Sequence, residues 1–161
     1  MKLLLSLLLL FPLTAFASLE ELLGPELVDA DGNKVELSSL DGKVIGLYFS
    51  AEWCGPCRAF TPDLVQAAKG SNDFEVVFVS SDRSAEDQAK YMKSYRMKWP
   101  AIPFDSEKRR ELSGRFGIRG IPSLIIIDDQ GNLITDQGRR ELGNNPRQAI
   151  RDWKKAAAKG S

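Results

Sequence analysis

Two consecutive units, each a buried strand followed by a helix, constrain the fold of this chain most strongly. Residues 44–50 ("VIGLYFS") and 74–81 ("FEVVFVSS") are apolar runs of strand length, which is typical of strands buried on both faces of a sheet. Helical spacing follows each run, over about 57–69 and 84–96. This β-α-β-α order predicts two parallel strands joined by a right-handed crossover.

Shorter elements surround this unit and complete a chain of about one domain's length. We expect a helix at 19–24, a hairpin within 25–40, a loop at 98–104, a helix at 108–116, a hairpin at 121–138 and a closing helix capped by Asn145. Together these elements predict an α/β fold, in which a mixed central β-sheet is flanked by helices and extended by an N-terminal β-hairpin.

The first seventeen residues differ in kind from the rest of the chain. Lys2 precedes an apolar run that closes with small residues at Ala15 and Ala17, the layout of a secretory signal peptide. The run is short for a membrane span of about 20 residues, although a retained anchor is the alternative. We therefore expect a signal peptide at 1–17, a domain at 18–161, and export, to the periplasm if the source is bacterial.

The charge balance argues against a nucleic-acid partner. Twenty-two basic residues match twenty-two acidic ones, so the chain as a whole has no field that would attract a polyanion. We expect a monomer that binds no nucleic acid.

The only two cysteines, Cys54 and Cys57, stand in "WCGPC" and admit four interpretations: a structural zinc site, a structural disulfide, two buried inert thiols and a redox-active dithiol. Two inert thiols would not need the flanking tryptophan or the Gly-Pro turn. A structural zinc site needs four ligands, but the chain offers two cysteines and no histidine. A structural staple is also disfavoured, since the entropic benefit of a disulfide grows with the size of the loop that it closes. The remaining interpretation is a redox-active dithiol, with no metal and no cofactor besides the Cys54–Cys57 disulfide.

Position assigns different roles to the two sulfurs. Cys54 falls where the strand ends and the helix begins, so free backbone N–H groups and the helix dipole favour its thiolate. Cys57 lies one turn further along the helix and is expected to be more buried. Cys54 is therefore the predicted nucleophile toward a substrate disulfide, and Cys57 is the cysteine that resolves the mixed disulfide.

At this point the sequence resembles the thioredoxin superfamily, through "WCGPC" between strand and helix and "GIPSL" further on. It is most similar to the tryparedoxin and nucleoredoxin branch, on "GKVIGLYFSAEWCGPCRAFTP", "VVFVSSDRS", "YMKSYRMKWPAIPF" and "FGIRGIPSLIIID". The resemblance implies a thioredoxin-like fold over nearly all of 18–161 and thiol-disulfide oxidoreductase activity.

The resemblance also implies a substrate-binding surface around the cysteines. Pro122 matches the family's cis-proline, and Ile121 before it would offer backbone groups to a bound substrate. Trp53 matches the tryptophan that flanks the nucleophile, and Gly55 and Pro56 separate the cysteines. From the sequence alone, a trans proline that starts a strand is the alternative for Pro122, and a partly buried packing residue is the alternative for Trp53.

Two positions depart from the family patterns. Thioredoxins carry a buried aspartate six residues before the nucleophile, but Tyr48 stands there, as in the tryparedoxin-like branch. Candidates for proton transfer are then Asp82, Glu86, the Tyr48 hydroxyl or water. The branch usually carries Cys-Pro-Pro-Cys, whereas this chain has the Gly-Pro of thioredoxins, which leaves partner preference open.

These features favour a reductase of exported protein disulfides, because Gly-Pro resembles the reducing members and strong oxidants typically have a histidine between the cysteines. The expected partners are protein disulfide substrates and a membrane thiol donor, the latter inferred from export alone. Cytochrome c maturation, a protein-disulfide oxidant or isomerase, and a non-catalytic chaperone-like binding module are the alternatives.

Overall fold

The computed structural model describes residues 18–160. The predicted signal peptide at 1–17 lies outside these residues. Within them, no helix combines the length and apolar character needed to cross a membrane.

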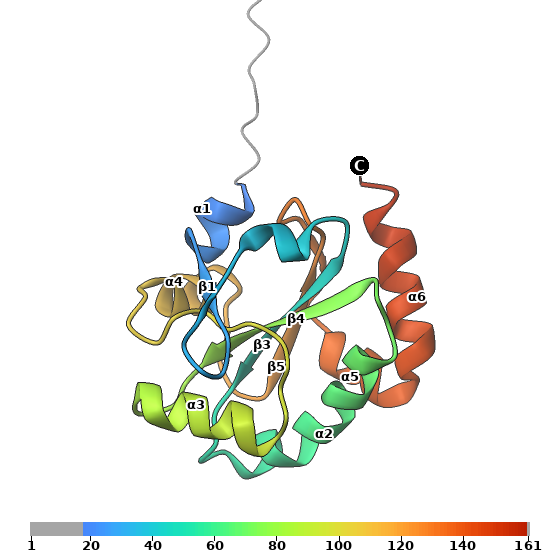
Figure 1. The fold of residues 1–161 in the computed structure, drawn as a ribbon. Helices are drawn as coiled ribbons and strands as arrows, with labels where there is room; N and C mark the ends of the chain where they lie inside the picture. The colour runs from blue at the N-terminus through green and yellow to red at the C-terminus, as the bar shows by residue number, and fades with distance from the viewer. Residues whose placement is uncertain (1–17, 161) are drawn as a thin grey trace, which may run out of the picture.

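The core of the fold is a four-stranded mixed sheet in the order β4-β3-β5-β6 (Figure 1). Its strands are β3 (Val44–Ser50), β4 (Phe74–Ser80), β5 (Ser123–Ile127) and β6 (Leu133–Thr135). β3 runs parallel to β4 and antiparallel to β5, and β5 and β6 form an antiparallel hairpin. This arrangement confirms the predicted mixed sheet, in which the first apolar run forms the central strand β3 and the second forms the edge strand β4.

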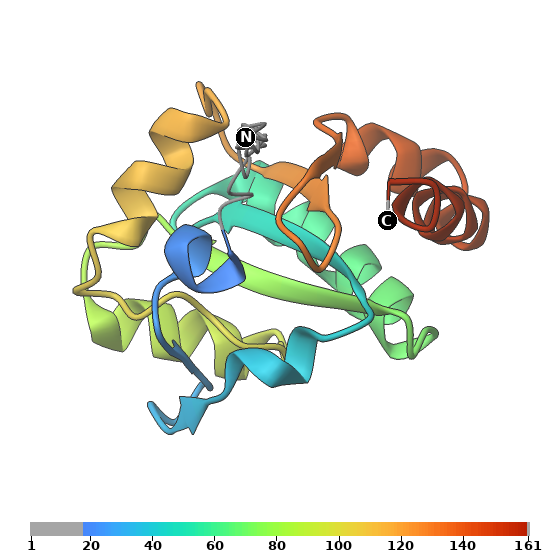
Figure 2. The same cartoon turned by 90° about the horizontal axis from the view of Figure 1, so that it is seen from above.

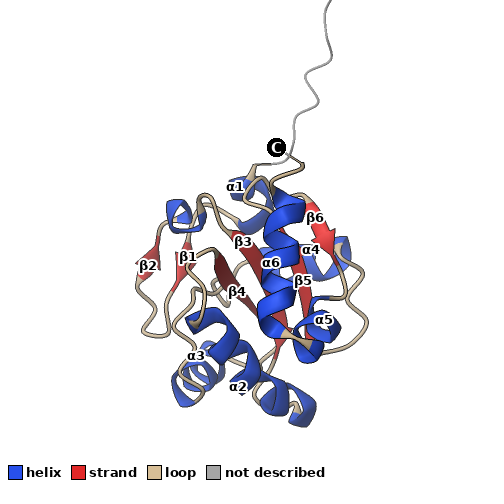
Figure 3. Cartoon of the chain, turned by 90° about the vertical axis from the view of Figure 1, so that its right-hand side faces the viewer, coloured by secondary structure: helices blue, strands red, loops and turns tan. Residues whose placement is uncertain are grey.

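Helices cover both faces of the sheet and create two hydrophobic layers. The helices are α1 (Leu19–Leu23), α2 (Gly55–Lys69), α3 (Ala85–Ser94), α4 (Lys108–Arg115), α5 (Gly138–Asn144) and α6 (Pro146–Ala157), with a 3₁₀ turn at Leu37–Leu40. One layer contains side chains of α2, α3, α5 and α6, and the other contains side chains of α1 and α4. Accordingly, α4 and α6 lie on opposite sides of the strands in Figures 1 and 2, and α6 crosses in front of them in Figure 3.

The predicted N-terminal hairpin forms from two very short strands, β1 (Leu27–Val28) and β2 (Lys34–Val35). The backbone of Val28 exchanges two hydrogen bonds with Ala101, at 2.8 and 2.9 Å. The segment 100–102 is also bonded to Phe78 of β4. The Phe78 carbonyl accepts from Ile102 N, and the Phe78 N–H donates to Pro100 O. The predicted proline-containing loop therefore ties the hairpin to the edge of the sheet.

The sequence analysis missed helix α5. Two glycines in seven residues weaken its intrinsic helical preference, so the local pattern carried little signal. Tertiary contacts stabilise it instead. Leu142 is buried, the Trp153 indole N–H donates to Glu141 at 2.6 Å, and Gly138 lies directly against the backbone of Leu124 in β5.

The close approach at Gly138 makes a testable prediction. A Cβ at this position would lie 2.7 Å from the Leu124 carbonyl oxygen and 2.8 Å from Ile126, so the backbone would have to shift. We expect Gly138→Ala to lower the free energy of unfolding by about 1–3 kcal/mol, measured by urea denaturation. Gly143→Ala in the same helix is the control. It meets open space and should be neutral or stabilising by up to about 1 kcal/mol. Equal losses in the two variants would contradict this explanation.

Candidate active site

The cysteine pair lies at the junction between β3 and α2. Cys54 is the N-cap residue of α2, and its sulfur accepts a hydrogen bond from the Cys57 backbone N–H at 3.2 Å. The two residues form a disulfide with their Cα atoms 5.2 Å apart. The helix begins at Gly55, two residues before the predicted start, so Cys57 lies within its first turn. The Cys57 N–H of that turn is directed at Cys54 Sγ, and together with the helix dipole it favours a thiolate after reduction.

Burial differs between the two sulfurs in the predicted order. Cys57 is completely buried, and Cys54 is 6% exposed. Cys54 is thus less accessible in the disulfide form than its place in an exposed turn suggested, because it packs with Ala51 and Ile121. Gly55 and Pro56, between the cysteines, are exposed.

The predicted proline segment lies beside the nucleophile. The Ile121–Pro122 peptide bond is cis, in agreement with the family resemblance. The Ile121 carbonyl oxygen lies 3.8 Å from Cys54 Sγ, although 67 residues separate them along the chain. The structure therefore brings together Cys54, Cys57, Ile121 and Pro122; their roles in substrate binding stay predictions.

Trp53 is the exposed side chain of this site. The residue is 52% exposed, so about half of its surface is free to contact a partner. The indole N–H nevertheless donates to the Ser81 carbonyl at 3.0 Å, and the neighbouring Glu52 N–H donates to Asp82 at 2.7 Å. These two bonds fasten the loop before Cys54 to the end of β4.

A buried network of hydroxyl groups replaces the aspartate of thioredoxins. The Tyr48 hydroxyl bonds to Thr61 at 2.8 Å and donates to the Cys57 carbonyl at 3.3 Å. Thr61 bonds in turn to Tyr91 at 2.6 Å, and Tyr91 to Ser50 at 3.1 Å. Burial raises the pKa of Tyr48 further above its already high ordinary value, so this network is uncharged at neutral pH.

The sequence analysis did not identify Thr61 and Tyr91 as part of this network. A signal for Thr61 was present, because a threonine four residues after Cys57 in a helix can donate back to the Cys57 carbonyl. It does so at 2.8 Å. Tyr91 comes from α3, and only the packing of α3 against α2 brings it here.

Two further side chains were candidates for proton transfer: Glu86 is exposed on α3, and Asp82 has a structural role. Its carboxylate accepts from the Ser80 hydroxyl and from Glu52 N, both at 2.7 Å. Burial raises its pKa above the ordinary value. Among residues 18–160, neither Asp82 nor Tyr48 has a hydrogen bond to a cysteine sulfur.

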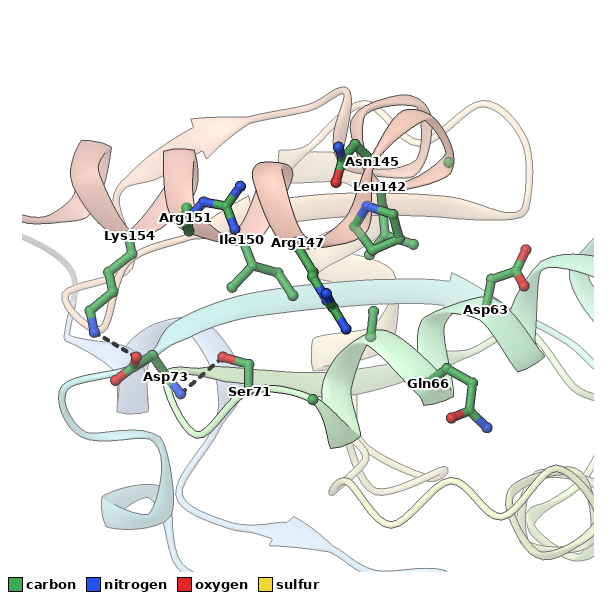
Figure 4. Close-up of a pocket in the computed structure, with 14 residues that line it drawn as sticks. Asp63, Gln66, Ser71, Asp73, Leu142, Asn145, Arg147, Ile150, Arg151 and Lys154 are labelled. Carbon is green, nitrogen blue, oxygen red and sulfur yellow. Dashed lines mark hydrogen bonds and ion pairs between the residues drawn. The ribbon is translucent and has the colours of Figure 1, made fainter.

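A cavity of about 810 Å³ lies elsewhere, between the end of α2 and the α5–α6 segment (Figure 4). Arg147 and Ile150 of α6 and Gln66 of α2 are among the residues that line it, and Lys154 pairs with Asp73 at 2.5 Å. None of the predicted site residues lines this cavity, so the candidate chemistry lies at the surface around the disulfide.

Comparison with known proteins agrees with this geometry. A family model described as thioredoxin-like matches residues 42–133, which include both cysteines. The chain belongs to the thioredoxin-like family. Within it, the similarities place the chain in the tryparedoxin and nucleoredoxin branch, as the sequence motifs implied.

Three relatives illustrate the match. The chain is 48% identical over 116 residues to probable nucleoredoxin 1 of Arabidopsis thaliana, covering 70% of this chain and 20% of that protein. It is 44% identical over 131 residues to Mus musculus nucleoredoxin, covering 78% of this chain and 29% of that protein. The structure of tryparedoxin II from C. fasciculata is 38% identical, with a TM-score of 0.70, and the match covers 76% of this chain and 82% of that one.

The chain thus spans between a fifth and three-tenths of the length of these two nucleoredoxins. Nucleoredoxin and tryparedoxin relatives are thiol-disulfide oxidoreductases, and this chain has the Cys-x-x-Cys pair of such a protein.

The same comparison contradicts the prediction of export. The curated relatives are nucleoredoxins, which are cytoplasmic and nuclear proteins, and they give no support to an exported or periplasmic location. The apolar run at the N-terminus was the sole basis of that prediction. The membrane thiol donor was inferred from export and loses its support with it.

The hydroxyl network predicts a small and specific effect of Tyr48→Phe. The substitution keeps the ring but removes one buried hydrogen-bonding group, so we expect a loss of about 1 kcal/mol in the free energy of unfolding. Because the hydroxyl contacts the backbone of Cys57 and not its sulfur, the rate of disulfide reduction should stay unchanged. Tyr95→Phe is the matched control, because Tyr95 is a partly buried tyrosine at the C-terminal end of α3. A large loss of rate at unchanged stability would instead assign proton transfer to Tyr48.

Burial of Asp82 predicts a dependence of stability on pH. The pKa of Asp82 in the folded state is raised above the ordinary value of 3.8. The contribution of Asp82 to the free energy of unfolding is therefore fully present below pH 3.8 and is lost as the pH rises through the raised pKa. Asp82→Asn removes the charge and can still accept from Glu52 N at its amide oxygen, while its amide N–H donates to the Ser80 hydroxyl instead of accepting from it. Relative to the wild type, it should therefore gain stability between pH 3 and pH 7 in urea unfolding. Asp63→Asn, on the exposed face of α2, controls for charge alone. If the difference in the free energy of unfolding between Asp82→Asn and the wild type does not change with pH, the prediction is contradicted.

Proposed function

We propose that this chain is a protein-disulfide reductase that acts through Cys54 and Cys57. The observation that supports it best is the placement of Cys54 Sγ. The sulfur caps α2, accepts the Cys57 N–H at 3.2 Å, and lies beside the cis Ile121–Pro122 segment. A helix N-terminus stabilises a thiolate, which is the attacking form in thiol-disulfide exchange.

The reaction proceeds in two exchanges. The Cys54 thiolate attacks one sulfur of the substrate disulfide, whose S–S bond breaks and releases the other sulfur as a thiolate. The Cys57 thiolate then attacks Cys54 Sγ and releases the second substrate sulfur, so the Cys54–Cys57 disulfide forms. The substrate has gained two electrons from the dithiol, and both released thiolates take protons at neutral pH. A dithiol donor must reduce the enzyme before the next cycle.

The sequence between the cysteines supports the reducing direction. Gly55 and Pro56 match the dipeptide of the reducing members of the superfamily, and the chain has no histidine to stabilise the Cys54 thiolate as in strong oxidants.

The surroundings of Cys54 suit an extended peptide substrate. Ile121 precedes β5 and is partly exposed, so its backbone can pair with a substrate strand. On the other side, the exposed ring of Trp53 and the exposed Gly55–Pro56 turn offer contact surface. We propose that these groups hold the substrate while its sulfur reaches Cys54.

Variants of the two cysteines test this function. In insulin reduction with dithiothreitol, Cys54→Ser should lower the rate to that of dithiothreitol alone, because the attacking sulfur is absent. Cys57→Ser should retain the first exchange but not the second, and should therefore accumulate a mixed disulfide with the substrate. Mass spectrometry of the Cys57→Ser protein after incubation with oxidised insulin measures this adduct.

The double variant lacking both cysteines is the control for binding without chemistry. Wild-type and Cys54→Ser proteins reducing insulin at the same rate would overturn the proposal and favour a chaperone-like binding module. A protein that oxidises reduced substrates faster than it reduces insulin would overturn the direction.

A further inference from the structure

A small cavity of about 150 Å³ lies where the C-terminal ends of α2 and α3 meet the start of β4. It shares no residue with the cysteine site or with the cavity beside α6. Its lining combines cationic side chains with apolar ones and a single carboxylate. α2 contributes Val65, Ala68 and Lys69, β4 contributes Glu75, and the segment after α3 contributes Arg96, Lys98 and Trp99.

The positive charge of this lining is not neutralised. Lys69, Arg96 and Lys98 are exposed, and none of their side chains has an ion pair or a hydrogen bond with another residue in 18–160. The carboxylate of Glu75 is already paired with Lys43, at 3.5 Å. The ends of α2 and α3 each add about half a negative charge, which leaves an excess of about two positive charges. An anion would therefore be attracted to this cavity.

The backbone at Arg96 is a second, independent observation. Arg96 is the one residue within 18–160, other than glycine, that has a positive φ, at 56°. It ends α3 in a Schellman turn, in which its N–H donates to the Lys93 carbonyl at 3.1 Å and the Met97 N–H donates to the Met92 carbonyl at 2.9 Å. Glycine is usual at this position, because a Cβ is unfavourable there. The turn therefore does not require an arginine, whose side chain instead lines the cavity.

The remaining lining is apolar and indicates what else a ligand would contain. Val65 and Trp99 are mostly buried, and Ala68 is half-buried, so part of their surface stays in contact with solvent. An apolar group seated on them would remove that surface from water, which an inorganic ion cannot do. A cavity of about 150 Å³ is large enough for one benzene-sized group.

We propose that this cavity is a binding site for a small organic anion. Lys69, Arg96 and Lys98 bind its negative group, and Val65 and Trp99 contact its apolar part. An arginine can bind a carboxylate through two parallel N–H groups, and the two lysines add positive charge beside it. The site is separate from the dithiol and does not depend on the proposed reductase function.

Three probes test the two parts of the site. Benzoate and benzamide have nearly the same shape, but only benzoate is charged, whereas acetate keeps the carboxylate and lacks the ring. Each is titrated into the ¹⁵N-labelled chain, and shifts are followed at the Trp99 indole N–H and the Arg96 and Lys98 backbone amides. Benzoate should bind about tenfold more tightly than benzamide, the effect of one hydrogen bond between charged groups. Acetate should also bind more weakly than benzoate.

Arg96→Gly separates binding from stability. The substitution removes the guanidinium at a position that already has a backbone conformation favourable for glycine. The affinity for benzoate should fall about tenfold, whereas the midpoint of urea unfolding should stay the same or rise. Lys90→Ala is the matched control, because Lys90 is an exposed cation of α3 that does not line the cavity. It should retain the wild-type affinity.

Four results would each overturn the proposal. They are benzamide binding as tightly as benzoate, acetate binding as tightly as benzoate, benzoate shifts confined to residues outside this cavity, and equal affinities of the wild type and Arg96→Gly for benzoate. The comparison of the three probes uses the wild type, so it stands even if Arg96→Gly does not fold.

Discussion

The parallel pairing of β3 with β4 is the constraint on which the site depends. The two strands are in register from Val44 opposite Phe74 to Ser50 opposite Ser80, so they end at the same edge of the sheet. Their following loops consequently lie side by side. Ser81 N donates to the Ser50 carbonyl, Asp82 accepts from Glu52, and Trp53 donates to Ser81. A shift of this register by one residue would turn the buried side chains of β3 to the opposite face and separate these loops.

Antiparallel β5 completes the site from the other side of β3. Its pairing sets Phe49 opposite Ser123, which places Pro122 just beyond the end of β3 and next to Cys54. The nucleophile is therefore held between two loops, one from each neighbour of the central strand. The disulfide joins residues only three apart, so the loop that it closes is too small to form a site. The surroundings of the disulfide are defined instead by the long-range pairing of β3 with β4 and β5.

The interior behind Cys57 carries hydroxyl groups where a carboxylic acid stands in thioredoxins. A chain of neutral groups, from Tyr48 through Thr61 and Tyr91 to Ser50, satisfies the Cys57 carbonyl without placing a charge in the core. Since burial raises the Tyr48 pKa, this network does not ionise near neutrality. Through the Cys57 carbonyl, the Tyr48 and Thr61 hydroxyls hold the first turn of α2 in place.

The sequence alone determined the elements with strong local signals and singled out Cys54 and Cys57 as the candidate reacting residues. Periodicity defined β3, β4 and α2 to within two residues, capping side chains defined the starts of α3 and α6, and two cysteines without a histidine left redox chemistry as the favoured interpretation. Only the tertiary structure decided the rest. Helix α5, whose glycines give little local preference, exists because it packs on β5, and Tyr91 and Ile121 reach their places through contacts between distant segments. Local propensity acts over a few residues, whereas a site or a cavity forms where segments distant in sequence come into contact. A local sequence pattern does not predict those contacts.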